Sequence, residues 1–318
     1  MAHNLQCEAF RCRRRWGLFL FALTLKLATS LVAGSYPLYN GSSPSVVLSD
    51  GLQGVCDMHS VHPRFVGGGA AFNMCLRPND LIGRVIKGKD GYWPECKHFQ
   101  QFWHHHKLDG IFLDVGGNIG SCSLLMAANR IPVIAFEPIP SNLFYFVESL
   151  RENKGFNVTV YPFGASAVHN TTTIFAEDGN WGNSMIGTPA NPNKKQYNFT
   201  INLAPLDDVL WPDRTQPPPA IGLLKLDVQG FEGEAIRGAQ ALLKAGAVKY
   251  LASEMEPHTL RANGMTAMGY CNLLKDSGFQ LIDWHGKPRD WAAYCSPYDL
   301  EENRDKIDNF WAKHLTQT

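Results

Sequence analysis

Short apolar runs punctuate the middle of the chain, and each of them stops at an acidic residue. The runs with their acids are 111–113 before Asp114, 132–136 before Glu137, 221–226 before Asp227 and 248–253 before Glu254. Short apolar runs bounded by turn residues are typical of strands that are buried on both faces. Four acids directly after four buried strands exceed what packing requires, so we expect a polar site where these strands end.

Segments with helical character separate these strands. They cover residues 121–129, 141–153, 232–245 and 265–277, and Ser141 has the residue type of an N-cap. Further strands are predicted at 158–163 and 279–284. The alternation predicts an α/β fold built on a doubly wound parallel sheet, in which ligands bind at the carboxyl ends of the strands.

Two further segments, 171–175 and 197–203, are predicted as strands of a β-ribbon around a polar loop. The loop contains DGNWGNS at 178–184, and we expect it to be mobile and to contact the acceptor. Trp181 lies at its centre. Candidate sugar-stacking residues are Trp181, Trp211, Trp284, Trp291 and Trp311, although each of them also fits a role in core packing.

The first 33 residues have the pattern of a targeting segment. Residues 11–15 read Arg-Cys-Arg-Arg-Arg, and residues 16–33 are an apolar run with Lys26 as its only charge. The run is short but workable for a membrane span, and the charge bias places residues 1–15 in the cytosol. A cleaved signal peptide is the alternative, because Ala28-Thr29-Ser30 is a small-x-small site. We therefore expect a cytosolic tail (1–15), a signal anchor or signal peptide (16–33), a stem and N-terminal extension (34–79) and a catalytic domain (80–318).

Both interpretations place the body of the protein in the secretory pathway. It would be held in the Golgi or endoplasmic reticulum membrane with its domain in the lumen, or secreted if the signal is cleaved. Four Asn-x-Ser/Thr sequons follow the apolar run, at Asn40, Asn157, Asn170 and Asn198. Six cysteines also follow it, and an even number permits disulfides in an oxidising compartment. Cys271 and Cys295 are candidates for a local pair, whereas Cys122 is expected to be a buried thiol within a helix.

Composition removes other classes of function. Lys and Arg (29) balance Asp and Glu (29), so the chain has no basic field and nucleic acid is not expected as a partner. No Cys-x-x-Cys occurs, and the consecutive histidines 104–106 cannot all face one ion on a helix. No metal site is therefore predicted.

The turn after the first of the four strands has the residues of a cofactor site. DVGGNIG at 114–120 combines an acid with Gly116, Gly117 and Gly120 before a helix, and glycines let the backbone approach a ligand closely. The pattern is not G-x-G-x-x-G, which disfavours a nicotinamide-dependent oxidoreductase. Glu137 ends the next strand, where a carboxylate can bind both ribose hydroxyls of a nucleoside cofactor.

Four blocks occur in a familiar order: DVGGNIG (114–120), AFEPIPSN (135–142), LDDVL (206–210) and LLKLDVQGFEGEAIRGAQALL (223–243). In these blocks the chain resembles the FkbM family of S-adenosylmethionine-dependent methyltransferases. The resemblance implies a Rossmann-like class I methyltransferase fold, with a mostly parallel doubly wound sheet, a reversed last strand and here a β-ribbon insertion. It also implies O-methylation, with Asp114, Gly116, Asn118 and Gly120 at the methionine part of the cofactor and Glu137 at its ribose.

Two positions depart from the family pattern. The usual G-A-N of the turn is Gly116-Gly117-Asn118, which is conservative. The usual K-I-D-V-E-G-x-E has Gln229 at its second acid, which questions an acidic role there but leaves Asp227 and Glu232.

Methyl transfer to a sugar hydroxyl benefits from a general base, because the hydroxyl has a high pKa. The candidates near the strand ends are Asp227, Glu232, Glu254, Glu256 and His258, and Asp227 is favoured because it ends the central strand opposite the cofactor turn. We therefore expect O-methylation of a hydroxyl on a glycan. The alternative is a non-catalytic binding protein that retains the fold.

Overall fold

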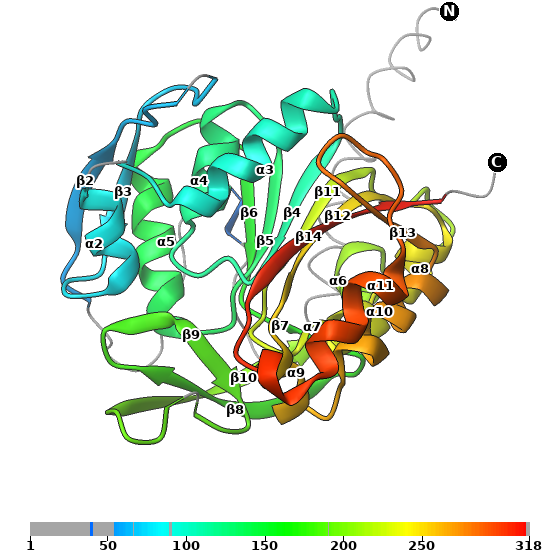
Figure 1. Cartoon of the computed structure of the whole chain (residues 1–318). Helices are drawn as coiled ribbons and strands as arrows, with labels where there is room; N and C mark the ends of the chain where they lie inside the picture. Colours follow the sequence, from blue (N-terminus) through cyan, green and yellow to red (C-terminus); the bar gives the residue numbers. More distant parts are fainter. Residues whose placement is uncertain (1–38, 41–53, 66, 89–90, 190, 316–318) are drawn as a thin grey trace, which may run out of the picture. The chain divides into compact units, whose positions relative to one another are not determined.

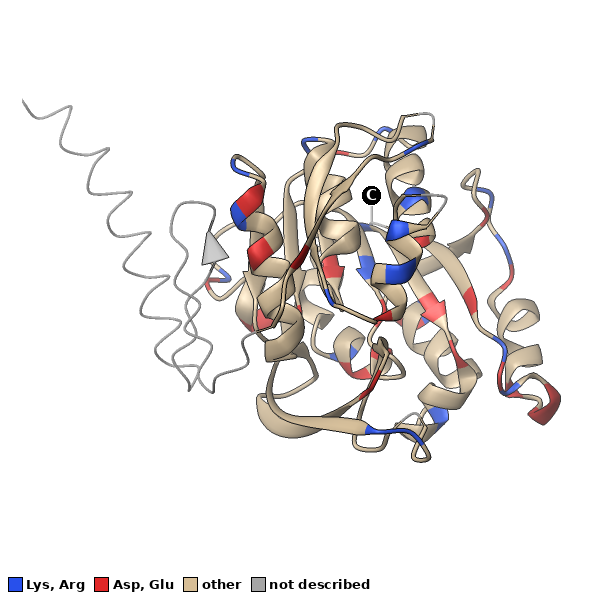
Figure 2. Cartoon of the chain, turned by 90° about the vertical axis from the view of Figure 1, so that its left-hand side faces the viewer, with Lys and Arg blue, Asp and Glu red and all other residues tan. Residues whose placement is uncertain are grey.

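The computed structural model of the chain describes residues 39–40, 54–65, 67–88, 91–189 and 191–315. The predicted tail and membrane segment (1–33) lie outside these residues, as does most of the predicted stem. In the part that is described, no helix is both long and apolar enough to cross a membrane. Lys and Arg are interspersed with Asp and Glu in Figure 2, as the zero net charge leads one to expect.

The main sheet has the strand order β1-β6-β5-β4-β11-β12-β14-β13 (Figure 1). Its parallel strands are β4 (Ile111–Val115), β5 (Val133–Phe136), β6 (Val158–Tyr161), β11 (Ile221–Leu226), β12 (Val248–Met255) and β13 (Phe279–Ile282). The strand β14 (Asp308–His314) runs antiparallel between β12 and β13, and β1 (Tyr39–Asn40) pairs antiparallel with β6. A mostly parallel sheet whose last strand, β14, is reversed is the class I methyltransferase fold, so the predicted fold is confirmed.

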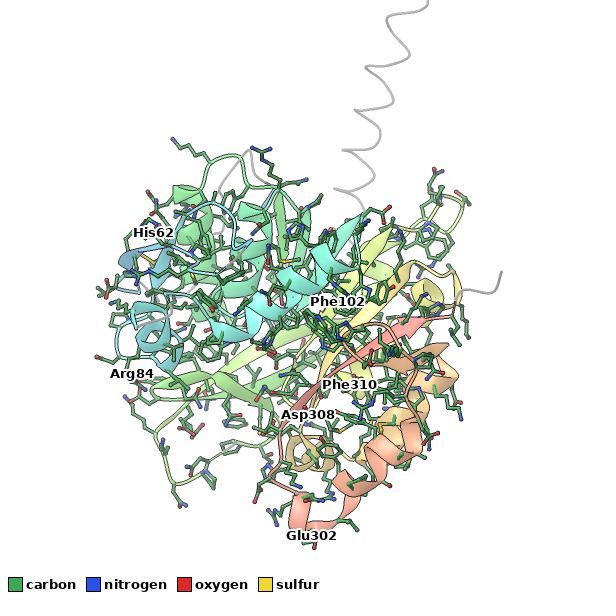
Figure 3. All side chains as sticks on the ribbon, turned by 45° about the horizontal axis from the view of Figure 1, so that its top comes forward. His62, Arg84, Phe102, Glu302, Asp308 and Phe310 are labelled. Carbon is green, nitrogen blue, oxygen red and sulfur yellow. A yellow bond between two sulfur atoms is a disulfide. The ribbon has the colours of Figure 1, made fainter. Side chains whose placement is uncertain are left out.

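Helices cover both faces of this sheet (Figure 1). One face carries α3 (Pro94–His105), α4 (Ser121–Ala128) and α5 (Pro140–Glu152), and the other carries α6 (Leu206–Leu210), α7 (Glu232–Arg237), α8 (Gln240–Lys244), α10 (Ala267–Asp276) and α11 (Trp291–Cys295). Successive residues of a strand face opposite sides. Phe112 therefore packs in the core beneath α3 to α5, with Phe102 of α3, while Leu113 packs in the core on the other face. Figure 3 shows Phe102 and, on β14, Phe310 among the packed side chains.

A second, four-stranded sheet has the order β7-β10-β8-β9. Its strands are β7 (Gly164–Ala165), β8 (Asn170–Glu177), β9 (Asn180–Ile186) and β10 (Gln196–Ala204). This ribbon sheet confirms the predicted β-ribbon. The predicted loop is not a mobile loop, however: Asp178 and Gly179 form a tight turn, and Trp181 lies on β9.

The N-terminal part of the described chain packs against the methyltransferase fold. A hairpin of β2 (Asp57–Val61) and β3 (Phe72–Leu76) precedes α2 (Leu81–Lys87). The backbone N–H of Cys75 donates to Ser149 Oγ of α5 at 2.8 Å. The boundary expected between residues 79 and 80 therefore does not separate two bodies.

Several element boundaries differ from the sequence expectation for local reasons. The helix predicted over 232–245 is divided into α7 and α8 at Gly238, where a Cβ would lie 2.0 Å from the carbonyl oxygen of Ser166. Glu254 lies inside β12 rather than beyond it. Ser141 is not an N-cap, because α5 begins at Pro140 and the Ser141 hydroxyl accepts a hydrogen bond from Arg77. The short helix α9 (Pro257–Ala262) and two 3₁₀ turns (Ser296–Asp299 and Glu301–Asn303) had no sequence signal that we recognised.

Three disulfides join the six cysteines that follow the apolar run: Cys56–Cys75, Cys96–Cys122 and Cys271–Cys295. The suggested pairing of Cys271 with Cys295 is confirmed. The expectation of a free thiol at Cys122 was wrong, because the first turn of α3 brings Cys96 against the first turn of α4. The apolar character of α4 indicated burial and gave no sign of this partner.

Candidate active site

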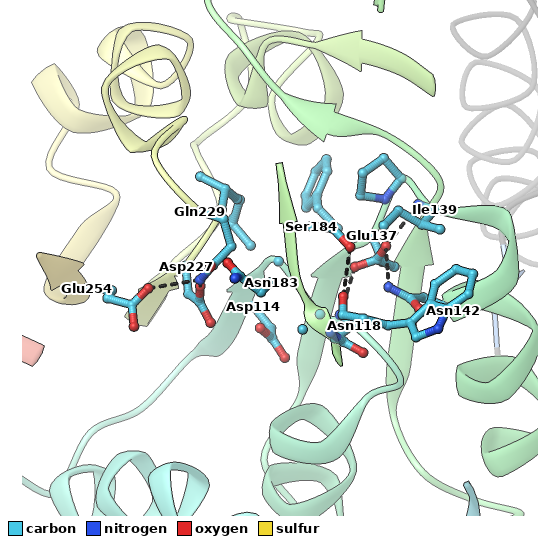
Figure 4. Close-up of a pocket in the computed structure, with 18 of the residues that line it drawn as sticks. Asp114, Asn118, Glu137, Ile139, Asn142, Asn183, Ser184, Asp227, Gln229 and Glu254 are labelled. Atoms are coloured by element: carbon cyan, nitrogen blue, oxygen red, sulfur yellow. Dashed lines mark hydrogen bonds between the residues drawn. The ribbon is translucent and has the colours of Figure 1, made fainter. Parts of the chain in front are cut away.

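A pocket with a volume of about 370 Å³ lies where the parallel strands end. The glycine turn, the ends of β5 and β11, the start of α3 and the strand β9 of the ribbon sheet line it. Figure 4 shows Glu137, Asn118 and Asn142 on one side and Asp227, Gln229 and Glu254 on the other. Strand direction explains this convergence, because parallel strands bring their carboxyl ends to one edge of the sheet.

The glycine turn follows β4 and has a shape that side chains would obstruct. Gly116 has a φ of +93°, and a Cβ there would lie 1.8 Å from the carbonyl oxygen of Asp227. Gly120 has a φ of +88° and a Cβ there would lie 2.3 Å from the ring of Phe146. Asn118 also adopts a positive φ, and its Oδ1 accepts from the backbone N–H of Ile119 at 2.7 Å. The turn is therefore held open by residue type and by a local hydrogen bond.

Glu137 is the carboxylate that the turn faces. Its Oε2 accepts from the backbone N–H of Asn118 at 2.8 Å, and its Oε1 accepts from the N–H of Ile139 and the Nδ2 of Asn142. Burial raises the pKa of Glu137 to about 7, although these hydrogen bonds oppose the increase. Each carboxylate oxygen has two lone pairs, so Oε2 can still accept one further donor, such as a ribose hydroxyl.

Asp114 and Lys225 form a buried ion pair beneath the turn. Lys225 Nζ lies 3.1 Å from Asp114 Oδ1 and donates to the carbonyl of Gly116 at 3.0 Å. Asp114 Oδ2 accepts from Ser123 Oγ at 2.6 Å. Burial lowers the pKa of Lys225, but the charges of Asp114 and Asp227 outweigh this and the pKa is raised. Lys225 therefore offsets the charges of Asp114 and Asp227.

Asp227 has access to the pocket and is fixed from two sides. Its Oδ2 lies 3.5 Å from Lys225 Nζ, and its Oδ1 accepts from Gln229 Nε2 at 2.8 Å. The side chain keeps a quarter of its surface exposed. The same Gln229 nitrogen donates to Glu254 Oε2 at 2.9 Å. The amide that replaces the family's second acid therefore joins the carboxyl groups of Asp227 and Glu254.

The other candidate bases differ in their surroundings. Burial, and then the charge of Asp227, raises the pKa of Glu254 well above its ordinary value, so this group holds its proton at neutral pH. Glu232 is buried and its Oε1 accepts from the backbone N–H groups of Val228 and Gly230. Glu232 and His258 are not among the residues that line the pocket, whereas Glu256 is.

The structure brings residues into the site that the sequence reasoning missed. Trp93, half-buried, and Glu95 line the pocket at the start of α3, and Asn142 lines it beside Glu137. The signal for Trp93 and Glu95 was the helix start Trp-Pro-Glu. Trp181 also lines the pocket, but it is only 7% exposed and stacks on Tyr197, with ring centroids 5.0 Å apart. In the described residues no group of three or more His, Cys, Asp or Glu side chains is arranged to hold a metal ion.

The pocket fits the nucleoside cofactor that the resemblance implies. Glu137 is placed to bind a ribose hydroxyl, and Ile139 and Phe163 supply an apolar wall for a purine. Gly116 and Gly117 line the pocket and would let the chain of the cofactor approach the backbone, whereas the predicted contact Gly120 packs against Phe146 and is not among the lining residues. Asp114 and Glu95 also line the pocket and suit the positive charges of an amino group and a sulfonium.

Comparison with known proteins gives the family. The family model of the methyltransferase FkbM domain matches residues 114–281. No curated protein matches the sequence.

Solved structures with a likeness are distant. A TehB-like SAM-dependent methyltransferase from Corynebacterium glutamicum is 11% identical, with 73% of this chain and 93% of that chain covered and a TM-score of 0.37. A putative methyltransferase from Streptococcus mutans in complex with SAH is 12% identical, with coverage of 70% and 97% and a TM-score of 0.37. The family match spans more than half of the chain and includes the glycine turn, Glu137 and Asp227. The chain therefore belongs to the FkbM family of S-adenosylmethionine-dependent methyltransferases.

Proposed function

We propose that this S-adenosylmethionine-dependent methyltransferase transfers a methyl group to a hydroxyl oxygen of a glycan, in the lumen of the secretory pathway. The observation that carries the proposal is Asp227, a partly exposed carboxylate held in the pocket opposite Glu137. When bound, S-adenosylmethionine supplies a methyl group on a positively charged sulfur. Transfer to an alcohol forms a C–O bond, breaks a C–S bond and releases the hydroxyl proton, which a base must accept.

Asp227 is the base that fits this step best. Glu254 holds a proton at neutral pH, and Glu232 is turned to the backbone of its own loop. Lys225 and Gln229 each contact one oxygen of Asp227 and so fix the orientation of its carboxylate. A carboxylate with a fixed orientation can position the acceptor hydroxyl. His258 does not line the pocket, and Glu256 lines it without the contacts to Lys225 and Gln229 that fix Asp227.

A glycan acceptor is supported by the residues at the start of α3. Trp93 offers a half-buried ring, and Glu95 offers a carboxyl group on the same wall of the pocket. Glu95 Oε2 lies 3.4 Å from Trp93 Nε1. Aromatic rings pack on the apolar faces of sugars, while carboxyl and amide groups bind their hydroxyls. Asn183 of β9 lines the same pocket and adds such an amide.

The luminal location is supported by the three disulfides, since such bonds persist in oxidising compartments. It is also supported by the sequon asparagines Asn157, Asn170 and Asn198, which are all exposed.

Methyl transfer from isotopically labelled S-adenosylmethionine to a panel of free glycans tests the reaction. The wild-type protein should label at least one glycan, and Asp227→Asn should reduce the rate about 100-fold, as expected for loss of a general base. The affinity for S-adenosylmethionine should change by less than about threefold, because Asp227 is fixed from the protein side. Asp208→Asn, an exposed acid paired with His169, is the matched control and should retain full activity.

Two results would contradict the proposal. Equal rates for wild type and Asp227→Asn would move the base to another residue. Cofactor binding with no label on any hydroxyl acceptor would favour the non-catalytic binding protein.

A further inference from the structure

Arg77 is a buried cation outside the part of the chain that the family model matches. It directly follows β3, its residue is 9% exposed, and its guanidinium lies between two aromatic rings. The guanidinium carbon is 3.7 Å from the ring centroid of Trp181 on β9 and 4.5 Å from that of Tyr145 on α5. Arg77 therefore joins the ribbon sheet to the helix that begins just after Glu137.

The guanidinium fork reaches the first turn of α5. Its Nη1 donates to Ser141 Oγ at 2.8 Å, and its Nη2 donates to Asn142 Oδ1 at 2.7 Å. The other end of the Asn142 amide, Nδ2, donates to Glu137 Oε1 at 3.2 Å. Arg77, Asn142 and Glu137 thus form a buried chain of hydrogen bonds that ends on the candidate ribose carboxylate.

The chemistry of the guanidinium fixes the direction of this chain. An arginine only donates, so the end of the Asn142 amide that faces Arg77 must be its oxygen. The nitrogen must then face Glu137, where a donor is required. Without the fork the amide could rotate and present its oxygen to the carboxylate, which would repel it. A lysine in place of Arg77 keeps the charge but has neither the planar fork nor the stacking surface.

Asp80 strengthens the same connection. Its Oδ1 accepts from the backbone N–H of Trp181 at 3.1 Å, and its Oδ2 accepts from that of Ile82 as the N-cap of α2. The ring that covers Arg77 is therefore itself tied to the segment that carries Arg77.

We propose that Arg77 is a positioning residue for cofactor binding: by orienting the Asn142 amide, it sets Glu137 to accept the ribose hydroxyls. The proposal rests on the assignment of Glu137 to the ribose and requires no acceptor. The N-terminal segment that precedes the matched family domain is accordingly part of the cofactor site.

The test compares two ligands that differ only in the ribose hydroxyls. These are S-adenosylhomocysteine and its 2′,3′-dideoxy analogue, titrated calorimetrically at a pH about one unit above the pKa of Glu137. For the wild type, the hydroxyls should improve affinity about 10- to 100-fold, the range for hydrogen bonds to a charged group. For Arg77→Lys the advantage should fall to within about threefold. Arg84→Lys is the matched control, because Arg84 lies on the exposed side of α2 (Figure 3) and should leave the ratio unchanged.

A merely structural role for Arg77 predicts a different pattern. Both ligands would then weaken in parallel and the ratio would stay at the wild-type value, which would overturn the proposal. Asn142→Ser removes the intermediate amide, so it should give the same loss of ratio with Arg77 intact. The double variant should lose no more than Asn142→Ser alone, because the two residues act in series.

Glu137→Gln separates this proposal from the assignment on which it rests. A variant that retains the full hydroxyl advantage would overturn both. Loss of the advantage in Glu137→Gln but not in Arg77→Lys or Asn142→Ser would overturn only the role of Arg77. None of these outcomes depends on the glycan proposal, since no methyl transfer is measured.

Discussion

At the residue scale, two buried glutamates have similar pKa values but different roles. Burial raises the pKa of both Glu137 and Glu232 to about 7. Glu137 faces the pocket, whereas Glu232 accepts two backbone N–H groups of its own loop. This loop carries Gln229 at a positive φ, so Glu232 acts on the site by holding the backbone.

Glu232→Gln should make stability less dependent on pH. A carboxyl whose pKa is raised on folding stabilises the protein fully below its unfolded value, near 4.5, and this contribution is lost as the pH rises through about 7. The variant has no such loss, and its amide oxygen can still accept both N–H groups. Its melting temperature relative to wild type should therefore rise by on the order of 5 °C between about pH 5 and pH 8.

Thermal unfolding at several pH values measures this difference. Glu234→Gln is the control, because Glu234 lies on the same helix but is partly exposed and paired with Arg237. A difference that stays constant across the range would show that Glu232 is not buried as a protonated acid.

The sequence identified the site residues that stand next to apolar strands. Asp114, Glu137 and Asp227 were found because a buried strand directly precedes each of them. Trp93 and Asn142, which line the pocket, and Arg77, which binds Asn142, were missed because tertiary packing rather than a neighbouring pattern places them. Gln229 was recognised as a departure, but its bonds to two acids depend on a backbone turn that no pattern specified.

At the element scale, α3 and α4 form one unit around the pocket. The disulfide Cys96–Cys122 joins the helix that carries Glu95 to the helix that follows the glycine turn. It thus connects the proposed acceptor wall to the cofactor turn.

Replacement of both cysteines by serine should lower the free energy of unfolding by about 3 kcal/mol, the value for a loop of this length. Denaturation by urea gives the free energy, and titration of S-adenosylmethionine should show weaker binding. The control variant replaces Cys271 and Cys295 by serine, because their disulfide closes a loop of similar length away from the pocket. This variant should lose stability without losing affinity for the cofactor. Equal affinity for S-adenosylmethionine in both double variants would show that the Cys96–Cys122 disulfide does not support the cofactor site.

Elements formed by a continuous run of apolar residues were predicted well, whereas elements that mix polar and apolar residues were not. The bounds of β11 agreed at both ends, because the whole strand is buried. β14 was not placed, since its sequence DNFWAKH has a run of only three apolar residues between polar ones and lies after several turns. The division between α7 and α8 comes from close approach of another loop to Gly238, which only the fold reveals.

At the scale of the whole molecule, the proposed luminal location makes a prediction about modification. Asn170 and Asn198 lie on exposed positions of the ribbon sheet, and Asn157 precedes β6. Protein produced in a secretory cell should lose mass on treatment with an N-glycosidase. Changing all four sequon asparagines to glutamine, Asn40 included, should abolish the shift. An unmodified wild-type protein would contradict passage through the lumen.

The central claim is that Glu137 and the glycine turn form the S-adenosylmethionine site, and one calorimetric titration tests it most directly. S-adenosylmethionine is titrated into wild type and Glu137→Gln at about pH 6 and pH 8. Ribose hydroxyls bind the ionised carboxylate, so the advantage of wild type over the variant should grow about tenfold as the pH rises through about 7. Ionisation of S-adenosylmethionine itself affects both proteins equally, so it cancels when wild type is compared with Glu137→Gln. Equal affinities at both pH values, or no binding by the folded wild type, would contradict the account.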